Sequence, residues 1–219
     1  MCRMMVIKSK ETMEIKDYFY SLSKMARTGK NNPHGDGYGY ILSTSDFVEC
    51  KKETTPIWEG NFSSTKCCFA LIHARKASPG YKVNIRHVHP FLCDMNGKTF
   101  AFMHNGTIYG TKENENIIDS QYYFSIVIEY LNSYLPGEAL KKAALEIEDQ
   151  YKYTSLTSVL TDLNRVWALK HNNFEKDSYY NLFFNDNGNT QIISSEPIEN
   201  YASFTIHSRE LENKELIEF

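Results

Sequence analysis

The first seven residues read MCRMMVI (1–7), with Cys2 directly after the initiator Met1. A small second residue allows Met1 to be trimmed, and Cys2 would then carry a thiol and a free α-amine on the same residue. Such an amine has an ordinary pKa of about 7.7 to 8.0, so much of it is neutral at cellular pH and can accept the thiol proton. The alternative is that Cys2 is a small apolar residue at the start of a strand over residues 2–7. The rest of the sequence must decide between these interpretations.

Composition excludes several classes of function. The chain has 219 residues and a formal net charge of -3, without a block of Lys or Arg that would predict nucleic-acid binding. No apolar run approaches the roughly 18 to 20 residues of a membrane span, and the N-terminus lacks a signal-peptide pattern. We therefore expect one cytoplasmic domain over residues 1–219, with neither nucleic acid nor membrane as a partner. Five cysteines without paired spacing predict buried thiols and no disulfides.

Hydrophobic periodicity predicts strands on both sides of a pair of central helices. A first helix is expected over 13–27, and two more over 119–130 and from Gly137 onward. Strands are expected at 2–7, 38–42, 46–51, 67–73, 99–104, 155–160, 165–171, 179–184, 190–194 and 204–207. Many turns between them are too short for crossover helices, which indicates antiparallel sheets covered by helices, an α+β layered fold.

Four short segments follow Cys2 in a fixed order: HGDGYGY (34–40), HARKAS (73–78), HPF (89–91) and FMHNGT (102–107). Together with Cys2 they resemble the class II glutamine amidotransferases, N-terminal-nucleophile (Ntn) hydrolases whose mature chains begin with Cys. The likeness is to their small stand-alone branch, called YafJ-like or Dug3-like, which includes relatives that cleave γ-glutamyl bonds. The resemblance implies a four-layer αββα sandwich of two antiparallel sheets flanked by helices. A weaker likeness at SSEP (194–197) extends it over nearly the whole chain.

The resemblance implies a catalytic set of Cys2, Asn105 and Gly106. Attack of Cys2 on the γ-carboxamide of the substrate would place negative charge on the carbonyl oxygen, which needs donors already aimed at it. Asn105 can supply a side-chain N–H and Gly106 a backbone N–H. Taken alone, an Asn-Gly pair is more often a hairpin turn. Its position after a strand, in a chain with Cys2 at the terminus, favours the catalytic interpretation.

Arg75 and Asp119 are the residues that the resemblance assigns to the two charged groups of glutamine. The planar guanidinium of Arg75 suits bidentate capture of the α-carboxylate, although an Arg at a strand end is usually a solvated charge. Asp119 would receive the α-ammonium group, or it could simply be the N-cap of a helix. The family often continues with Ser or Thr and then Glu, whereas here Ser120 is followed by Gln121.

The remaining predicted site residues line the pocket. Gly37, Tyr38 and Gly39 are expected to shape it, because Gly tolerates close backbone approach and unusual φ angles. Lys76 and Ser78 are expected to lie along it, and residues 89–91 to pack beside it. No cofactor is expected, and no metal either, because His87, His89 and the other histidines lack a regular ligand pattern such as His-Glu-x-x-His.

The sequence thus predicts an amidohydrolase that cleaves glutamine or another γ-glutamyl small molecule through a thioester on Cys2, releasing glutamate and ammonia or an amine. Because 219 residues are too few for a fused synthase domain, ammonia would pass to a separate synthetase subunit, or the reaction would be simple hydrolysis. The alternative is an inactive binding or regulatory module on the same fold. Oligomer formation is possible.

Overall fold

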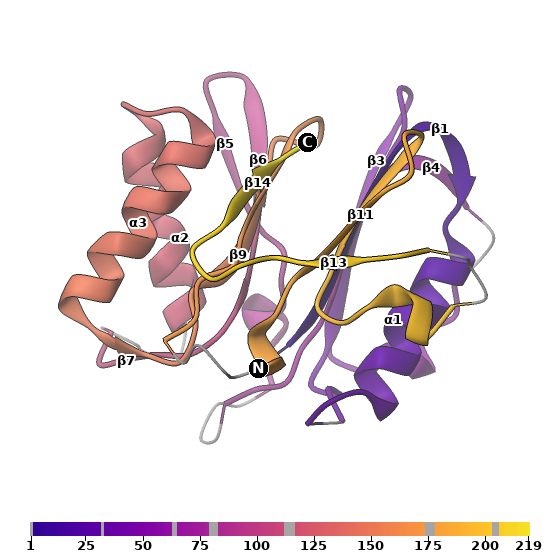
Figure 1. Ribbon diagram of the computed structural model, residues 1–219, viewed down its shortest axis with the longest axis horizontal. Coiled ribbons are helices and arrows are strands. Elements are labelled where there is room, and N and C mark those ends of the chain that lie inside the picture. The colour runs from indigo at the N-terminus through magenta and orange to yellow at the C-terminus, as the bar shows by residue number, and fades with distance from the viewer. Residues whose placement is uncertain are drawn as a thin grey trace. The chain divides into compact units, whose positions relative to one another are not determined.

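The computed structural model describes residues 2–31, 33–62, 65–78, 83–111, 117–173, 178–202 and 206–219. The chain divides into two compact units, each discontinuous in sequence. Unit 1 comprises Met1–Pro90 and Asn181–Leu211, and unit 2 comprises Phe91–Tyr180 and Glu212–Phe219. Each unit has its own sheet and its own helices (Figure 1). The assignment of residues 1–219 to one domain stays a prediction.

Unit 1 is built on a seven-stranded antiparallel sheet with the strand order β13-β11-β12-β1-β4-β2-β3. The strand that follows Cys2 therefore lies in the interior of the sheet, between β12 and β4. Its residue Met5 pairs with Ser194 on one side and with Ile72 on the other. The strands are β1 (Arg3–Glu14), β2 (Tyr38–Ser43), β3 (Val48–Glu53), β4 (Lys66–Ala74), β11 (Phe183–Asp186), β12 (Thr190–Ser194) and β13 (Arg209–Glu210).

One face of this sheet is covered by α1 (Lys16–Thr28) (Figure 1). Phe19, Leu22 and Met25 recur at helical spacing and are buried in one apolar cluster with strand residues of β1, β2 and β4. This confirms that the apolar stripe of the first helix is core. The predicted start at residue 13 is wrong, because Met13 and Glu14 still pair with β4 and the helix begins only at Lys16. Unit 1 also contains the 3-10 turns Ile57–Glu59, Ile85–His87 and Ile198–Asn200.

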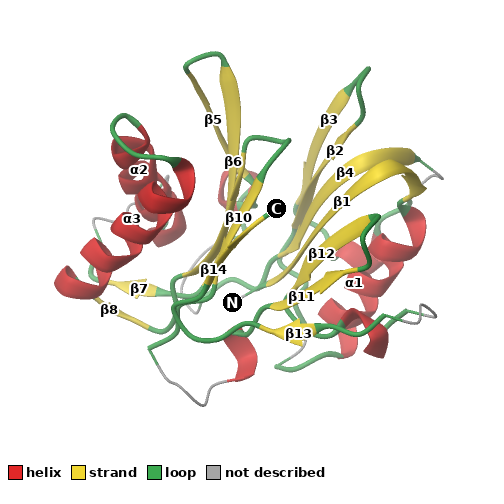
Figure 2. Cartoon of the chain, turned by 45° about the horizontal axis from the view of Figure 1, so that its top comes forward, coloured by secondary structure: helices red, strands yellow, loops and turns green. Residues whose placement is uncertain are grey.

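Unit 2 is built on a five-stranded antiparallel sheet with the order β14-β10-β9-β6-β5, next to the short pair β7-β8. Both α2 (Asp119–Leu131) and α3 (Pro136–Gln150) pack on it and on each other (Figure 2). Pro136 occupies the first turn of α3, where its missing N–H costs nothing. The strands are β5 (Phe91–Met95), β6 (Lys98–Asn105), β7 (Ile108–Tyr109), β8 (Lys152–Tyr153), β9 (Thr157–Thr161), β10 (Val166–Leu169) and β14 (Leu216–Glu218).

Two predicted strands are wrong or untested. Tyr179 and Tyr180 lie in a 3-10 turn, Ser178–Tyr180, and the strand begins only at Phe183. Their aromatic rings suit a strand by propensity, but here they pack edge to face in a buried turn. Of the predicted strand at 204–207, residues 204 and 205 lie outside the described residues, and 206–207 are not in a strand. Prediction also missed β5, β7, β8, β13 and β14, of which all but β5 are only two or three residues long.

The α+β prediction with antiparallel sheets and covering helices is confirmed. None of the five cysteines forms a disulfide, but the expectation that they are buried holds only for Cys2 and Cys67, and Cys50 is exposed. No described helix combines the length and apolar composition that a membrane-crossing helix needs.

Candidate active site

Cys2 lies immediately before β1, so its position is set by the interior strand of the unit 1 sheet. Side chains alternate between the faces of a strand, so Cys2 belongs to the same face as Met4. Met4 pairs with His73 of β4, and Gly39 of β2 pairs with His73 from the other side. The register therefore directs Cys2 and His73 to the face of the sheet opposite α1. Cys2 is buried, with 6% of its surface exposed.

The Cys2 thiol has an unusually low pKa. Burial raises it, but the positively charged amino group of Met1, the imidazole of His73 and a hydrogen bond from the backbone N–H of Lys76 together lower it by more. The resulting pKa is about 6. Much of the thiol is therefore ionised at neutral pH, which is the nucleophilic form.

His73 is a site residue that sequence reasoning did not assign a role. It is fully buried, and its ring lies against that of His89, with ring centroids 4.2 Å apart. The predicted packing of residues 89–91 beside the site is thus matched at His89. Sequence could not assign this role, because the contact of His73 with Cys2 depends on the register between β1 and β4.

The loop before β2 is shaped by glycines. Gly37 has a φ of +118°, which a residue with a side chain rarely adopts. A Cβ at Gly39 would lie 2.2 Å from the carbonyl oxygen of His89, so only glycine allows this approach. The structure does not bring the Tyr38 side chain together with Cys2, because Tyr38 is buried in the apolar cluster with α1.

Arg75 follows β4 and is fixed through its backbone. Its N–H donates to the carbonyl of Gly37 (2.8 Å), and its carbonyl accepts from the N–H of Asp36 (3.0 Å). The Asp36 carboxylate in turn accepts from the N–H of Ala77 (2.8 Å). Next to Arg75, the Lys76 ammonium donates to the carbonyl of Asn31 (2.6 Å). Ser78 is half-buried at the end of the described part of this loop.

The guanidinium of Arg75 is a buried cation without a carboxylate partner in the described part of the chain. The residue is 4% exposed, and its side chain makes a long contact, 3.5 Å from Nη1 to the carbonyl oxygen of Asp36. A buried charge that is not paired is costly. An anionic ligand that bound here would compensate the charge of the Arg75 guanidinium.

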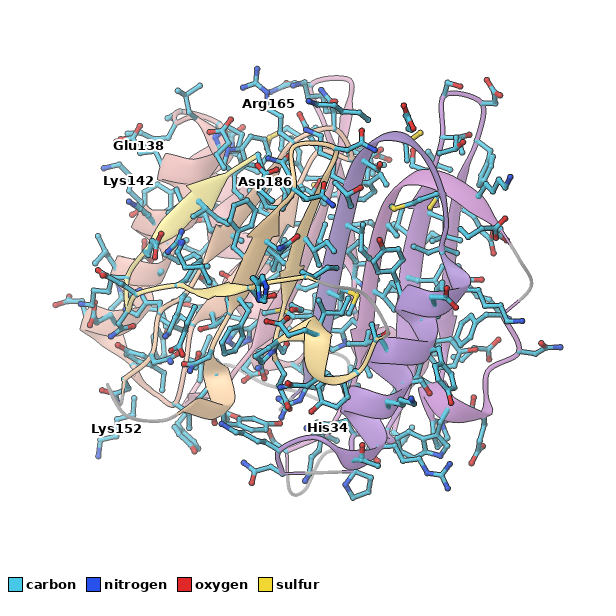
Figure 3. All side chains as sticks on the ribbon, turned by 45° about the vertical axis from the view of Figure 1, so that its right-hand side comes forward. His34, Glu138, Lys142, Lys152, Arg165 and Asp186 are labelled. Carbon is cyan, nitrogen blue, oxygen red and sulfur yellow. The ribbon has the colours of Figure 1, made fainter. Side chains whose placement is uncertain are left out.

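Arg3, in the same unit, is a buried cation that does have a carboxylate partner. It is 0% exposed and forms an ion pair with Glu196, at 2.6 Å between Nη2 and Oε1. His34, labelled in Figure 3, is also buried, and its Nδ1 donates to the carbonyl of Ala26 in α1 (3.0 Å). Burial and the nearby positive charge of Arg3 lower the pKa of His34 to about 3, so this imidazole is neutral.

In unit 2, Asn105 and Gly106 lie at the end of β6. Asn105 is fully buried and pairs with Thr157 of β9. A Cβ at Gly106 would lie 1.8 Å from the carbonyl oxygen of Ser155, so this position requires glycine. The same carbonyl accepts a hydrogen bond from Nε2 of His104 (2.9 Å). The Asn-Gly pair thus lies at the end of a strand, as expected from the sequence.

Asp119 is the first residue of α2, and the N-cap is Ile118 rather than Asp119. Its carboxylate accepts from the N–H of Ile108 (2.9 Å) and from that of Ser120 (2.8 Å). The Ser120 hydroxyl also lies 2.9 Å from Nδ1 of His104. Asp119 therefore ties the start of α2 to β7, the strand directly after the Asn-Gly pair. No cluster of three or more potential metal ligands occurs among the described residues.

Comparison with known proteins matches the chain to one family. Residues 1–176 match the family of class II glutamine amidotransferases. Over 95 residues the chain is 27% identical to YafJ of Escherichia coli, a protein assigned by name to the glutamine amidotransferases, with 41% of this chain and 37% of YafJ covered. The chain spans about 40% of the length of the curated relatives it matches.

Solved structures show the same fold. Glutamine phosphoribosylpyrophosphate amidotransferase from Bacillus subtilis matches 99% of this chain with 47% of its own, at a TM-score of 0.72 and 15% identity. A predicted glutamine amidotransferase from Pseudomonas aeruginosa matches all of this chain with 97% of its own, at a TM-score of 0.59 and 15% identity. The predicted Ntn-type sandwich fold is therefore confirmed.

Proposed function

Because the chain belongs to the class II glutamine amidotransferases, we propose that it cleaves the γ-amide bond of glutamine or of another γ-glutamyl compound, with Cys2 as nucleophile. The proposal rests on two groups in unit 1: a nucleophile for the γ-carbonyl carbon of the substrate and a cation for its α-carboxylate. Cys2 is a buried thiol, with a pKa of about 6 in the chain that retains Met1, and Arg75 is a buried cation without a carboxylate partner in the described part of the chain.

In the proposed first step, the Cys2 sulfur attacks the γ-carbonyl carbon, a C–S bond forms, and the carbonyl electrons move to the oxygen. The side-chain amide of Asn105 and the backbone N–H of Gly106 are the proposed donors to that oxyanion. Collapse of the intermediate breaks the C–N bond, and the nitrogen leaves with a proton as ammonia or an amine. The α-amine of Cys2, freed by removal of Met1, is the proposed acid and base.

In the second step, water attacks the γ-glutamyl thioester, the C–S bond breaks, and glutamate leaves while the thiolate is restored. Splitting amide cleavage in this way replaces one difficult step by two easier ones. Arg75 is proposed to hold the α-carboxylate of the substrate, and Asp119 its α-ammonium group. Gly37, Lys76 and Ser78 are proposed to shape or line the substrate pocket, whereas the side chain of Tyr38 packs in the apolar cluster with α1. Ammonia released from glutamine would be passed to a separate synthetase subunit, whereas release of an amine from a γ-glutamyl peptide would be simple hydrolysis.

The experiment is glutamate release by protein whose N-terminus is confirmed by intact mass as Cys2. Glutamine and a panel of γ-glutamyl peptides are offered in parallel. We expect release from one of these classes, loss of release in Cys2→Ala, and retention in Cys67→Ala, which alters a second buried thiol of the same unit. Full activity of Cys2→Ala would refute the proposal, and no release from any substrate would support the inactive-module alternative.

The role of Arg75 has its own test. We expect Arg75→Ala to raise the KM for glutamine about 10- to 100-fold, because a hydrogen bond to a charged group contributes roughly 1.5–3 kcal/mol. The variant should lose the preference of the native protein for glutamine over glutamine α-amide, in which the carboxylate is neutralised. Arg165→Ala is the control, since Arg165 is an exposed residue paired with Glu218 (Figure 3). An unchanged preference in Arg75→Ala would exclude Arg75 as the carboxylate ligand.

A further inference from the structure

The segment SSEP (194–197) contacts Arg3 and Met4, the two residues that follow Cys2. Glu196 and Arg3 form an ion pair of 2.6 Å, and the side chain of Arg3 is fully buried while that of Glu196 is 9% exposed. The segment continues β12, which pairs with β1 up to Met5 and Ser194. The contact therefore extends the β1-β12 ladder toward the nucleophile.

Each partner of the ion pair also holds backbone. Nη1 of Arg3 donates to the carbonyl of Cys2 (3.3 Å), and Nη2 donates to the carbonyl of Lys30 (2.6 Å). Oε1 of Glu196 accepts from the N–H of Lys30 (3.0 Å), and its Oε2 accepts from the hydroxyl of Tyr201. The pair thus connects the peptide of Cys2 with the loop after α1 and with the C-terminal part of unit 1.

Ser195 hydrogen-bonds to both backbone groups of Met4, the next residue of β1. The N–H of Met4 donates to the Ser195 hydroxyl oxygen (2.9 Å), and the N–H of Ser195 donates to the carbonyl of Met4 (3.0 Å). Ser195 is 0% exposed. Residues 2, 3 and 4 are therefore all bound, through Arg3 and Ser195, to the segment that contains Glu196.

A buried ion pair is weak evidence for stability, because two apolar residues of similar volume are often as stable or more so. A nucleophile, in contrast, must be held accurately, and a misplacement of about 1 Å can cost roughly 100-fold in rate. Resting on the function proposed above, we propose that Glu196 is a positioning residue, which acts through Arg3 to hold Cys2 in its reactive place.

The test separates stability from positioning. Glu196→Gln leaves Arg3 as an uncompensated buried charge, so it should lower both the melting temperature and kcat. The double variant Arg3→Met with Glu196→Leu removes both charges and should regain the melting temperature. We expect its kcat for glutamate release to stay about 100-fold below that of the native protein. Alkylation of Cys2 by iodoacetamide, followed by peptide mass analysis, should be slowed in both variants.

Glu199→Gln is the matched control. Glu199 accepts hydrogen bonds from the N–H and the hydroxyl of Ser208, at 3.0 and 2.8 Å, in the same unit. It should lower stability without changing the rate of Cys2 alkylation at a temperature where the variant is folded. If the double variant does not fold, Glu196→Gln and Glu199→Gln are compared at a temperature where both are folded, and equal rates of Cys2 alkylation in the two would refute the role of Glu196.

Recovery of kcat and of Cys2 alkylation together with the melting temperature in the double variant would overturn the proposal, because Glu196 would then be merely structural. The alkylation rate needs no substrate. If the native protein releases glutamate from no substrate, the proposed function fails, while unchanged Cys2 alkylation in the double variant would separately refute the role of Glu196.

Discussion

At the scale of single residues, Cys2 and Cys67 show how one unit gives two buried thiols opposite properties. Burial raises the pKa of Cys67 to about 11, helped by the neighbouring Cys68, and that thiol is not ionised at neutral pH. Burial acts on Cys2 in the same direction, but the N-terminal amino group and His73 reverse the result and bring its pKa to about 6. Burial alone therefore does not decide the chemistry of a thiol.

This difference predicts the pH dependence of alkylation. A lowered pKa means that Cys2 loses its proton as the pH rises through about 6, so its reaction rate should rise through pH 6 and level off above pH 7. Cys67 should remain unmodified across this range. Iodoacetamide pulses followed by peptide mass analysis measure both rates in one sample. A Cys2 rate that keeps rising through pH 8 to 9, like that of an ordinary thiol, would contradict the lowered pKa.

The His73→Asn variant tests whether the imidazole of His73 lowers the pKa of Cys2. Removing the imidazole removes one of the groups that lower the pKa of Cys2, so the midpoint of the alkylation profile should shift to higher pH. His207→Asn is the control, because His207 is an exposed residue of the same unit. An unchanged midpoint in His73→Asn would assign the lowered pKa to the amino group and the backbone N–H of Lys76, without His73.

Residue chemistry was partly predictable from sequence. The position of Cys2 after Met1 and the forked donors of Arg75 are properties of the residues themselves, and both were singled out from sequence. The roles of His73 and Glu196 arise only from strand pairing. Ser195 bonds to Met4 across 191 residues of sequence, a separation that no local pattern reports.

At the scale of elements, the start of α2 is tied to the sheet of unit 2 by consecutive side chains. Asp119 accepts from the N–H of Ile108, and the side chain of Gln121 accepts from the N–H of Ile118, the N-cap residue (3.0 Å). The Gln at position 121, which departs from the common family pattern, therefore has a structural role in this chain. Between them, the Ser120 hydroxyl contacts Nδ1 of His104.

Ser120→Ala should lower the free energy of unfolding by about 1–3 kcal/mol, because it deletes a buried hydrogen bond of His104. Urea titration followed by circular dichroism measures the change. Ser125→Ala is the matched control on the same helix, since Ser125 is exposed and bonds only to the carbonyl of Tyr122 in the described part of the chain. Equal effects of the two substitutions would contradict a specific link between α2 and β6.

The elements were predicted best where one pattern dominates. The helical spacing of Phe19, Leu22 and Met25 identified α1, but its start was missed because pairing of Met13 and Glu14 with β4 outweighs helix propensity. Short strands such as β14 offer too few residues for an alternating pattern. Strand order was not predictable either, because β1 pairs with β12 and β4, both distant in sequence.

At the scale of the whole molecule, the last eight residues belong to unit 2 although unit 1 directly precedes them in the chain. Within unit 2, β14 pairs with β10 through Trp167 and Glu218, and the N–H of Val166 donates to the carbonyl of Phe219 (2.8 Å). The N–H of Lys170 donates to the carbonyl of Glu215 (3.0 Å). The edge of the unit 2 sheet thus depends on a distant part of the sequence.

Deletion of residues 212–219 should therefore loosen unit 2 selectively. The amides of Val166 and Lys170 should lose most of their protection from hydrogen exchange, while amides of β1 and β4 in unit 1 should keep theirs. Glu218→Ala is the control, because it removes only an exposed ion pair with Arg165, of roughly 0–1 kcal/mol. Equal loss of protection in both units would show that they unfold together.

The contact between Ser195 and Met4 also sets an order of events during synthesis. A ribosome adds about 5–20 residues per second, so Cys2 is made roughly 10–40 s before the segment that binds its neighbours. Throughout that interval the growing polypeptide contains the Cys2 thiol but not Ser195 and Glu196, which bind the residues next to it. Cys2 is thus among the first residues to leave the ribosome and among the last to reach its final position, so the proposed active site forms only when translation is nearly complete.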